Sequence, residues 1–318
     1  MLSDKKLSAV ICCYRDEGNI GVMHQRLTAV LSRLTPWYEI IFVNDCSPDD
    51  SEQLLRSIAA KDPHVTVILQ ARNFGAQAAF TAGMVQATGD AVILLDGDLQ
   101  DPPELIEDFV KKWNEGFEVV YGIRRRREKS MGNLKQWLYH MFYVLFRRLS
   151  YVKMPTDAGE FSLIDRKAVD HINALPERDR LIRGLRAWVG FRQTGVEYVR
   201  PERYSGTSTN NLRSNLRWAR KAIFSFSYAP LEWVSRIAIF TMLLSIIGII
   251  FYVVTFFLFP GVPRGTTTLF VLVLFLGSVQ LLSISIIAEY IGRIFEETKQ
   301  RPRYITREIV NDHRKNAH

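Results

Sequence analysis

The sequence predicts an α/β protein in which a doubly wound, mostly parallel sheet is followed by interfacial amphipathic helices and a two-helix transmembrane hairpin. Three observations carry this prediction. Short apolar runs typical of buried strands alternate with helical patterns over residues 7–95, which favours parallel strands joined by crossover helices. Each of these runs ends in a polar cluster. Two long uncharged apolar segments follow residue 236.

The first part of the chain predicts four strands and two helices. Apolar, partly β-branched runs mark the strands, and Asp and Ser in the segment NDCSPDDS are suited to cap the second helix. Ligands of such sheets bind at the carboxyl ends of the strands, where the polar clusters lie. The predicted strands are Leu7–Cys13, Glu39–Val43, Val65–Leu69 and Ala91–Leu95, and the predicted helices are Ile20–Leu34 and Ser51–Ala60.

The most informative stretch is AVILLDGDLQDPPE, which begins at Ala91. If the chain stays extended past the strand, Asp96, Asp98 and Gln100 project their oxygens into one space. Three oxygen donors there suit Mg²⁺ or Mn²⁺ that already carries phosphate oxygens. A solvated acidic turn is the alternative, and the position after a buried strand favours the metal site.

Polar residues after the other strands indicate a nucleotide. The chain has no Walker loop and no G-x-G-x-x-G fingerprint, so a nucleotide diphosphate carried on the metal is the natural phosphorylated ligand. We expect Asp45 to accept a hydrogen bond from the imide N–H of uracil, and Tyr14 to place its ring against the base. Taken alone, each is more often an ordinary turn residue. Arg72 and Asn73 follow the third strand and belong to the same crevice.

The composition narrows the class of protein. A formal net charge of +8 suits nucleic acid, a membrane surface or an anionic substrate, and the basic residues cluster beside the apolar segments, which favours the membrane over nucleic acid. Three cysteines without metal-ligand spacing argue against a disulfide framework and a zinc site. Residues 1–6 are too short and polar for a signal peptide, so we expect the first two-thirds of the chain on the cytosolic side.

Two segments are predicted to cross the membrane, Ile237–Phe259 and Leu269–Ala288. Their connection carries only Arg264 as a basic residue, whereas Arg213–Arg236 and Arg293–Arg307 are rich in Arg and Lys. The positive-inside rule then predicts a multi-pass protein of the cell membrane with both termini cytoplasmic. Hairpins of this kind often associate, so we expect a homo-oligomer.

Basic segments beside the membrane predict further contacts. Asn133–Leu149 carries one apolar stripe, which suits packing on the core and the membrane interface equally, while Leu212–Phe226 favours the interface. The segment GIRRRREK clusters guanidinium groups that hold phosphate bidentately, and a solvated loop is the alternative. The candidates for binding a second phosphate there are Arg124, Arg127 and Lys129.

The chain contains, in order, the motifs YRDEGNI, VNDCSPDDS, RNFGAQAA, LLDGDLQDPPE, VVYGIR, DAGEFSLIDR and RGLRAWVGFRQTG. This series resembles the family 2 glycosyltransferases with the GT-A fold, and within them the branch of bactoprenol glucosyltransferases and dolichol-phosphate mannose synthases. The resemblance covers nearly the whole chain. It implies inverting transfer of a sugar from a nucleotide sugar to the phosphate of a polyprenyl lipid at the cytoplasmic face, with Mg²⁺ or Mn²⁺ as cofactor.

The resemblance also implies roles for individual residues. Asp157 matches the acidic residue placed as base or acceptor orienter, and because a lipid phosphate is already anionic at neutral pH we expect it to orient. Asp98 and Arg124 complete the predicted catalytic residues. The predicted nucleotide-sugar site contains Tyr14, Asp16, Glu17, Asp45, Arg72, Asp96 and Arg203, the metal site Asp96, Asp98 and Gln100, and the acceptor phosphate site Arg124, Arg127 and Lys129.

The chain departs from the family pattern at a few positions. Thr209 and Asn210 stand where Lys and Tyr are common, so either the loss of a cation near the diphosphate weakens donor binding, or another basic residue such as Arg213 takes its place. Arg15 and Cys46 replace a usual Asn and Gly, which affects contacts to the base and ribose more than metal binding.

The leading prediction is transfer of glucose from UDP-glucose to undecaprenyl phosphate, with GDP-mannose or UDP-GlcNAc as alternative donors. A processive polysaccharide synthase is opposed by Ser214, which stands where the Gln of Gln-x-x-Arg-Trp belongs, and by the two apolar helices, too few for a polymer channel. A non-catalytic sugar-nucleotide or lipid-phosphate binding protein is the rival from another class. The predicted parts are a GT-A catalytic domain (1–211), a juxtamembrane helix (212–230), two transmembrane helices (231–290) and a basic cytoplasmic tail (291–318).

Overall fold

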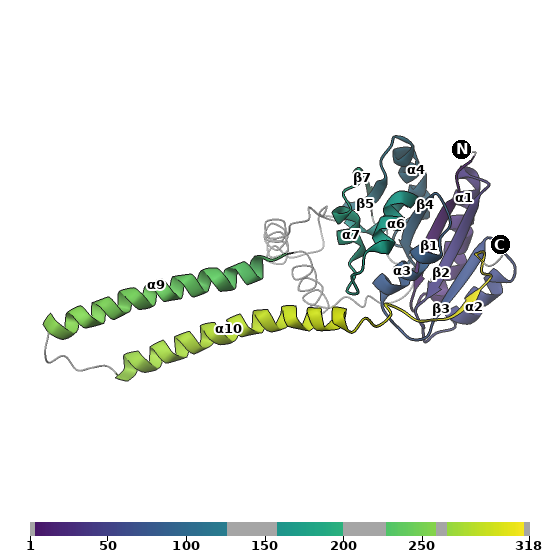
Figure 1. Ribbon diagram of the computed structural model, residues 1–318. Helices are drawn as coiled ribbons and strands as arrows, with labels where there is room; N and C mark the ends of the chain where they lie inside the picture. The colour runs from purple at the N-terminus through teal and green to yellow at the C-terminus, as the bar shows by residue number, and fades with distance from the viewer. Residues whose placement is uncertain (1–3, 126–157, 200–226, 259–265, 315–318) are drawn as a thin grey trace. The chain divides into compact units, whose positions relative to one another are not determined.

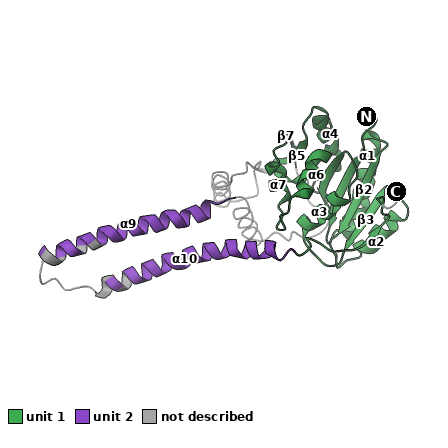
Figure 2. Ribbon diagram, viewed as in Figure 1, with its two compact units in different colours: residues 1–147, 152–211, 301–318 green, residues 148–151, 212–300 purple. Residues whose placement is uncertain are grey.

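A computed structural model describes residues 4–125, 158–199, 227–258 and 266–314. The chain falls into two compact units (Figure 2): residues 1–147, 152–211 and 301–318 form unit 1, and residues 148–151 and 212–300 form unit 2. The amphipathic helices predicted for 133–149 and 212–226 lie outside the described residues. The two units are described separately below.

Among its described residues, unit 1 is built on an eight-stranded sheet with the order β7-β5-β6-β4-β1-β2-β3-β8. Strands β4, β1, β2 and β3 are parallel neighbours, and β5 pairs in parallel with β7, whereas β6 and β8 run antiparallel to their neighbours. The mostly parallel α/β sheet is therefore confirmed. The strands are β1 Leu7–Cys13, β2 Tyr38–Asn44, β3 Val65–Gln70, β4 Ala91–Asp96, β5 Val119–Arg125, β6 Ala158–Asp165, β7 Gln193–Val199 and β8 Thr306–Val310.

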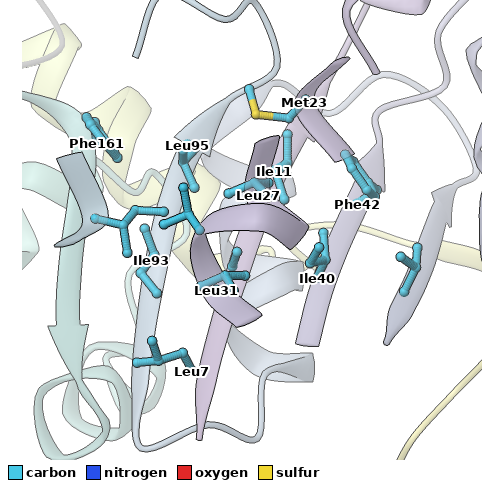
Figure 3. Packing of buried hydrophobic residues seen from close by; sticks show 14 of the residues in the cluster. Leu7, Ile11, Met23, Leu27, Leu31, Ile40, Phe42, Ile93, Leu95 and Phe161 are labelled. Carbon is cyan, nitrogen blue, oxygen red and sulfur yellow. The ribbon is translucent and has the colours of Figure 1, made fainter. Parts of the chain in front are cut away.

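Helices cover both faces of this sheet (Figure 1). Met23, Leu27 and Leu31 of α1 pack on side chains of β1, β2 and β4, all of them buried (Figure 3). The opposite face of β1 meets α3, where a Cβ on Gly83 would lie 2.1 Å from Cγ1 of Val10. The helices of unit 1 are α1 Glu17–Leu34, α2 Ser51–Ala59, α3 Ala76–Gln86, η1 Pro103–Leu105, α4 Ile106–Asn114, α6 Arg166–Ala174 and α7 Ile182–Trp188.

The last strand, β8, comes from the segment that the sequence assigns to a basic tail. It pairs antiparallel with β3, at one edge of the sheet. Arg56 of α2 donates to both carboxylate oxygens of Glu308, at 3.0 and 2.5 Å, and Asn311 donates to the carbonyl of Val65 at 2.8 Å. The segment TREIV is too short and too charged to read as a strand from its sequence, and long-range pairing with β3 provides its hydrogen bonds.

Unit 2 contains the two apolar helices, α9 Ala229–Leu258 and α10 Thr266–Thr298. Both are longer than the predicted segments at 237–259 and 269–288. Their mean hydropathy reaches 2.7 over Ala229–Thr255 and 2.0 over Leu272–Thr298, and large apolar side chains such as Phe251 and Leu274 are exposed in both. By length and composition, each helix can cross a membrane.

Candidate functional site

The parallel strands bring the loops of the predicted site to one edge of the sheet. In register, Cys13 of β1 lies opposite Asn44 of β2, and Cys12 lies opposite Asp96 of β4. The loops that follow are joined directly, because the Asp45 N–H donates to the Cys13 carbonyl at 3.1 Å. The Gly97 N–H likewise donates to Cys12 at 3.0 Å. Asp16, Asp45 and Asp96 therefore belong to one edge, as the sequence predicts.

The turn after β4 differs from the predicted extended chain. The residues after Asp96 form a turn in which Leu99 has φ +57°, and the Asp98 carboxylate accepts from the Gln100 N–H at 3.1 Å. Gly97 and Leu99 are nevertheless buried while Asp96, Asp98 and Gln100 are half-buried. Burial therefore alternates along this turn as it would along an extended chain. That the oxygens of Asp96, Asp98 and Gln100 share one space stays a prediction.

Gly97 permits close contact between the β1 and β4 loops. A Cβ at this position would lie 2.8 Å from Oδ2 of Asp16 and 2.9 Å from the carbonyl oxygen of Cys12. The same Asp16 oxygen accepts from the Tyr14 N–H at 3.0 Å. The glycine between Asp96 and Asp98 thus lets the carboxylate of Asp16 approach the end of β4.

The carboxylates at this edge repel one another. Burial, followed by the charges of Asp101 and Asp98, raises the pKa of Asp96 to about 7, although Arg124 opposes the rise. Burial also raises the pKa of Asp16 to about 6, with a further contribution from Asp98. Such clustering of acidic groups in a crevice is typical of functional sites.

This donor set fits a divalent ion that is shared with a phosphorylated ligand. Among the described residues, no group of three His, Cys, Asp or Glu side chains could hold a metal ion by itself. Mg²⁺ usually binds one or two carboxylates and completes its coordination with substrate phosphates and water. Asp96 and Asp98 match that pattern, and a cation there would relieve the repulsion that raises the pKa of Asp96.

Asp45 has a structural role that the sequence did not predict. The side chain is 1% exposed, and its two carboxylate oxygens accept from the N–H groups of Phe74 at 2.7 Å and Gly75 at 2.8 Å. Burial raises the pKa of Asp45, and these two hydrogen bonds oppose the rise. Asp45 thus holds the loop before α3, in which Gly75 adopts φ +91°. A contact from its remaining lone pairs to a base stays a prediction.

Arg124, at the end of β5, is held by two residues that the sequence did not single out. Its Nε donates to the Tyr198 hydroxyl at 3.2 Å, and its Nη2 lies 3.5 Å from Oδ2 of the fully buried Asp101. The Tyr198 hydroxyl donates to the other Asp101 oxygen. Burial lowers the pKa of Arg124, but the charge of Asp101, the contact with Tyr198 and the charge of Asp96 together outweigh it, so the pKa rises. Arg124 is a fixed cation beside the acidic cluster.

Comparison with known proteins decides the family. The model of the family described as glycosyl transferase family 2 matches residues 8–172. A 42% identical relative, an uncharacterized glycosyltransferase of Synechocystis, covers 96% of this chain and 95% of its own length over 305 residues. The chain belongs to glycosyl transferase family 2. This membership confirms the resemblance and, with the sheet described above, the GT-A fold that it implied.

Two further comparisons are with proteins whose names state an activity. The SfII prophage-derived bactoprenol glucosyl transferase of Shigella flexneri is 38% identical over 312 residues, which is 98% of this chain and 99% of that protein. Among solved structures, glucosyl-3-phosphoglycerate synthase of Mycobacterium tuberculosis with Mn²⁺, UDP and phosphoglyceric acid is 18% identical. It covers 70% of this chain and 77% of its own, with a TM-score of 0.46.

The other residues predicted for this glycosyltransferase lie at the rim of the site or outside the described ranges. Tyr14 is 37% exposed, and the Arg72 guanidinium lies 4.1 Å from the centre of the Phe74 ring. Glu17 begins α1, where its N–H donates to Asp49 at 3.3 Å. Asp157, Arg127, Lys129, Arg203, Thr209 and Asn210 lie outside the described residues.

Proposed function

We propose that this glycosyltransferase transfers glucose from UDP-glucose to undecaprenyl phosphate at the cytoplasmic face of the cell membrane, with inversion, and releases UDP. The observation that carries the proposal is the placement of Arg124, a fixed cation, beside the acidic end of β4 that includes Asp96 and Asp98. A cation and a carboxylate pair suit a reaction between two phosphorylated substrates. Near full-length relatives that are named bactoprenol glucosyl transferases support the choice of sugar and lipid.

The donor would lie along the ends of β1, β2, β3 and β4. In this proposal Tyr14 stacks on the base, Arg72 and Arg203 contact the diphosphate, and Asp45 keeps the loop before α3 in place. Asp96, Asp98 and Gln100 would hold Mg²⁺ or Mn²⁺. When bound, the ion neutralises charge that develops on the departing diphosphate.

The acceptor phosphate would lie against Arg124, with Arg127 and Lys129 following in the chain. A phosphate monoester has a second pKa of about 6, so the attacking oxygen is largely deprotonated at neutral pH. Asp157 then orients the acceptor and need not remove a proton. The Asp101 and Tyr198 contacts keep the Arg124 side chain from collapsing onto the neighbouring carboxylates.

Helices α9 and α10 would anchor the enzyme as a membrane hairpin, with both termini cytoplasmic. Their exposed apolar side chains need an apolar surrounding, which a bilayer or a second copy of the hairpin supplies. We include a homo-oligomer in the proposal for this reason. A membrane anchor would bring the enzyme to the lipid acceptor.

The direct test uses the purified full-length protein with labelled UDP-glucose and undecaprenyl phosphate, with and without a chelator. We expect a labelled lipid product that disappears on chelation and returns with Mn²⁺ or Mg²⁺. GDP-mannose and UDP-GlcNAc as donors test the choice of sugar. Tight donor binding without product on any polyprenyl phosphate would overturn the proposal in favour of a binding protein.

Arg124→Ala tests the assigned acceptor site. The variant should raise the KM for the lipid phosphate by about 10-fold or more, because a buried charge-assisted contact is lost. The KM for the nucleotide sugar should change much less. The control is Arg33→Ala, since Arg33 forms an exposed ion pair with Glu107 away from the edge. An equal loss for both substrates would contradict the assignment.

A further inference from the structure

Arg186, in the middle of α7, is buried without enough partners. It is 0% exposed and is the largest of the fully buried side chains among the described residues. Its Nη2 donates to the Gly159 carbonyl at 3.3 Å and its guanidinium lies 5.1 Å from the centre of the Tyr121 ring, but Nε and Nη1 have no partner. A buried guanidinium in this state is costly, and an apolar side chain would usually serve the fold at least as well.

The contact of Arg186 leads to the proposed acceptor site. A Cβ on Gly159 would lie 2.7 Å from Nη2 of Arg124, so the backbone at this glycine supports the Arg124 guanidinium from one side. Arg186 donates to the carbonyl of the same residue. One turn earlier on α7, Arg183 donates to the Ala158 carbonyl at 3.1 Å. Helix α7 thus holds two consecutive carbonyls at the start of β6.

Helix α3 ties the same segment to the start of α7. Gln77 accepts from the Ile182 N–H at 2.7 Å and donates to Oε1 of Glu160 at 3.0 Å. Glu160 is also one of the carboxylates that raise the pKa of Asp96. The segment 158–160 therefore connects α7 and α3 to both Arg124 and the acidic cluster, and it begins directly after Asp157.

We propose that Arg186 is a positioning residue that, together with Arg183, fixes the start of β6 so that Arg124 keeps the geometry required for sugar transfer. The proposal rests on the proposed function for the reaction itself. Arg186 touches neither substrate. It acts through the Gly159 backbone on Arg124, so its loss should lower kcat and raise the KM for the lipid phosphate, while donor binding stays unchanged. A purely structural role predicts no difference between the effect on kcat and the effect on donor binding.

Arg180 provides a matched control. It is 3% exposed, its Nη2 donates to the Ile172 carbonyl at 2.5 Å, and its Nε and Nη1 also have no partner. Arg180 and Arg186 are therefore alike in exposure and in having Nε and Nη1 without a hydrogen-bond partner. They differ in what they hold, since Arg180 contacts the end of α6 and Arg186 contacts β6 beside Arg124.

The experiment compares Arg186→Met, Arg186→Lys and Arg180→Met in the full-length protein. Misplacement of reacting groups by about 1 Å can lower a rate by about 100-fold, so we expect Arg186→Met to lower kcat by about 10- to 100-fold with the donor KM unchanged. Arg186→Lys, which keeps the cation without the fork, should give an intermediate kcat. Arg180→Met should keep the wild-type kcat. Equal kcat values for Arg186→Met and Arg180→Met would overturn the proposal.

Hydrogen exchange separates this proposal from the proposed function. In Arg186→Met, amides of β6 from Ala158 to Ser162 should exchange faster than in the wild type, while those of β1 should not change. If the wild type transfers no sugar to any lipid phosphate, the proposed function fails, and unchanged exchange in β6 would then refute the positioning role as well. If Arg186→Met does not fold, a wild-type kcat in Arg186→Lys overturns the proposal.

Discussion

Carboxylates at the two ends of the same sheet have pKa values that are shifted in opposite directions. At the amino end, Glu39 is 3% exposed and accepts from the Ser8 hydroxyl at 2.6 Å, the Thr88 N–H at 2.7 Å and Nζ of Lys6 at 3.1 Å. Burial alone would raise the pKa of Glu39, but these donors bring it below its usual value. At the carboxyl end, burial and like charges raise the pKa of Asp96 to about 7.

The difference supports the proposal that the carboxyl end of the sheet binds a ligand, whereas the amino end stabilises the fold. Glu39 has its charge neutralised by groups of the protein itself, so it stabilises the folded chain. Asp96 and Asp16 carry charge that their surroundings disfavour, and that arrangement is favourable only when a cation or substrate arrives.

Asp98→Ala should reduce sugar transfer by about 100-fold or more, because a metal-ion contribution of several kcal/mol is lost from the transition state. The protein should fold as before, since Asp98 is half-buried and contributes little to the core. The measurements are product formation and the rise in Tm on adding Mn²⁺, which should vanish. Retained activity with retained metal dependence would place the ion elsewhere.

Glu39→Gln should lower the free energy of unfolding by about 2 kcal/mol, because buried donors of Ser8, Thr88 and Lys6 lose a charged acceptor. Folded protein should keep its kcat, since Glu39 lies at the end of the sheet opposite the proposed site. Denaturant unfolding measures the change. Glu107→Gln is the control, because its exposed pair with Arg33 contributes less than about 1 kcal/mol. Lost activity at unchanged stability would contradict the conclusion that Glu39 serves the stability of the fold.

The Glu39 contribution should depend on pH in a defined direction. The pKa of Glu39 lies below 4.5 in the folded protein, so its stabilisation is complete above the unfolded value of 4.5. It is lost as the pH falls through the folded pKa, since the unfolded state binds the proton first. The difference in unfolding free energy between wild type and Glu39→Gln should therefore be constant near neutral pH and shrink below 4.5. A difference that grows on acidification would contradict this sign.

Tyr198→Phe should have the smallest effect. The variant removes one hydrogen bond to Asp101 and one from Arg124, while the 3.5 Å contact between Arg124 and Asp101 remains. We expect the KM for the lipid phosphate to rise about 3- to 10-fold, as for the loss of about 1 kcal/mol. Steady-state kinetics with each substrate varied in turn measures it. A change confined to the donor KM would remove Tyr198 from the acceptor side.

Much of the site was predictable because parallel strands end at one edge. The apolar runs of β1 to β4 were located within a residue or two. That was enough to predict that Asp16, Asp45 and Asp96 lie at the same edge of the sheet. Their individual roles were less predictable. Asp45 satisfies backbone amides of the loop before α3, which belong to a segment about thirty residues away in the chain.

The residues that the sequence did not reveal act over long range. Tyr198 reaches Asp101 from a strand 97 residues away, and β8 joins β3 across more than 230 residues. Nothing in the sequence around Arg186 marks it as buried, and charged residues are rarely buried. Only the packing of α7 on β6 shows that it is enclosed.

The sequence by itself determined the family, the order of strands and helices in the first hundred or so residues, and the two membrane-length apolar segments. These features depend on local periodicity and on motifs that are contiguous in the chain. The tertiary structure decided which buried charges are stabilised by protein donors and which are disfavoured by burial and like charges, as Glu39 and Asp96 show. Burial and partner distance set the free energy of a charge, and both arise only when distant segments pack together.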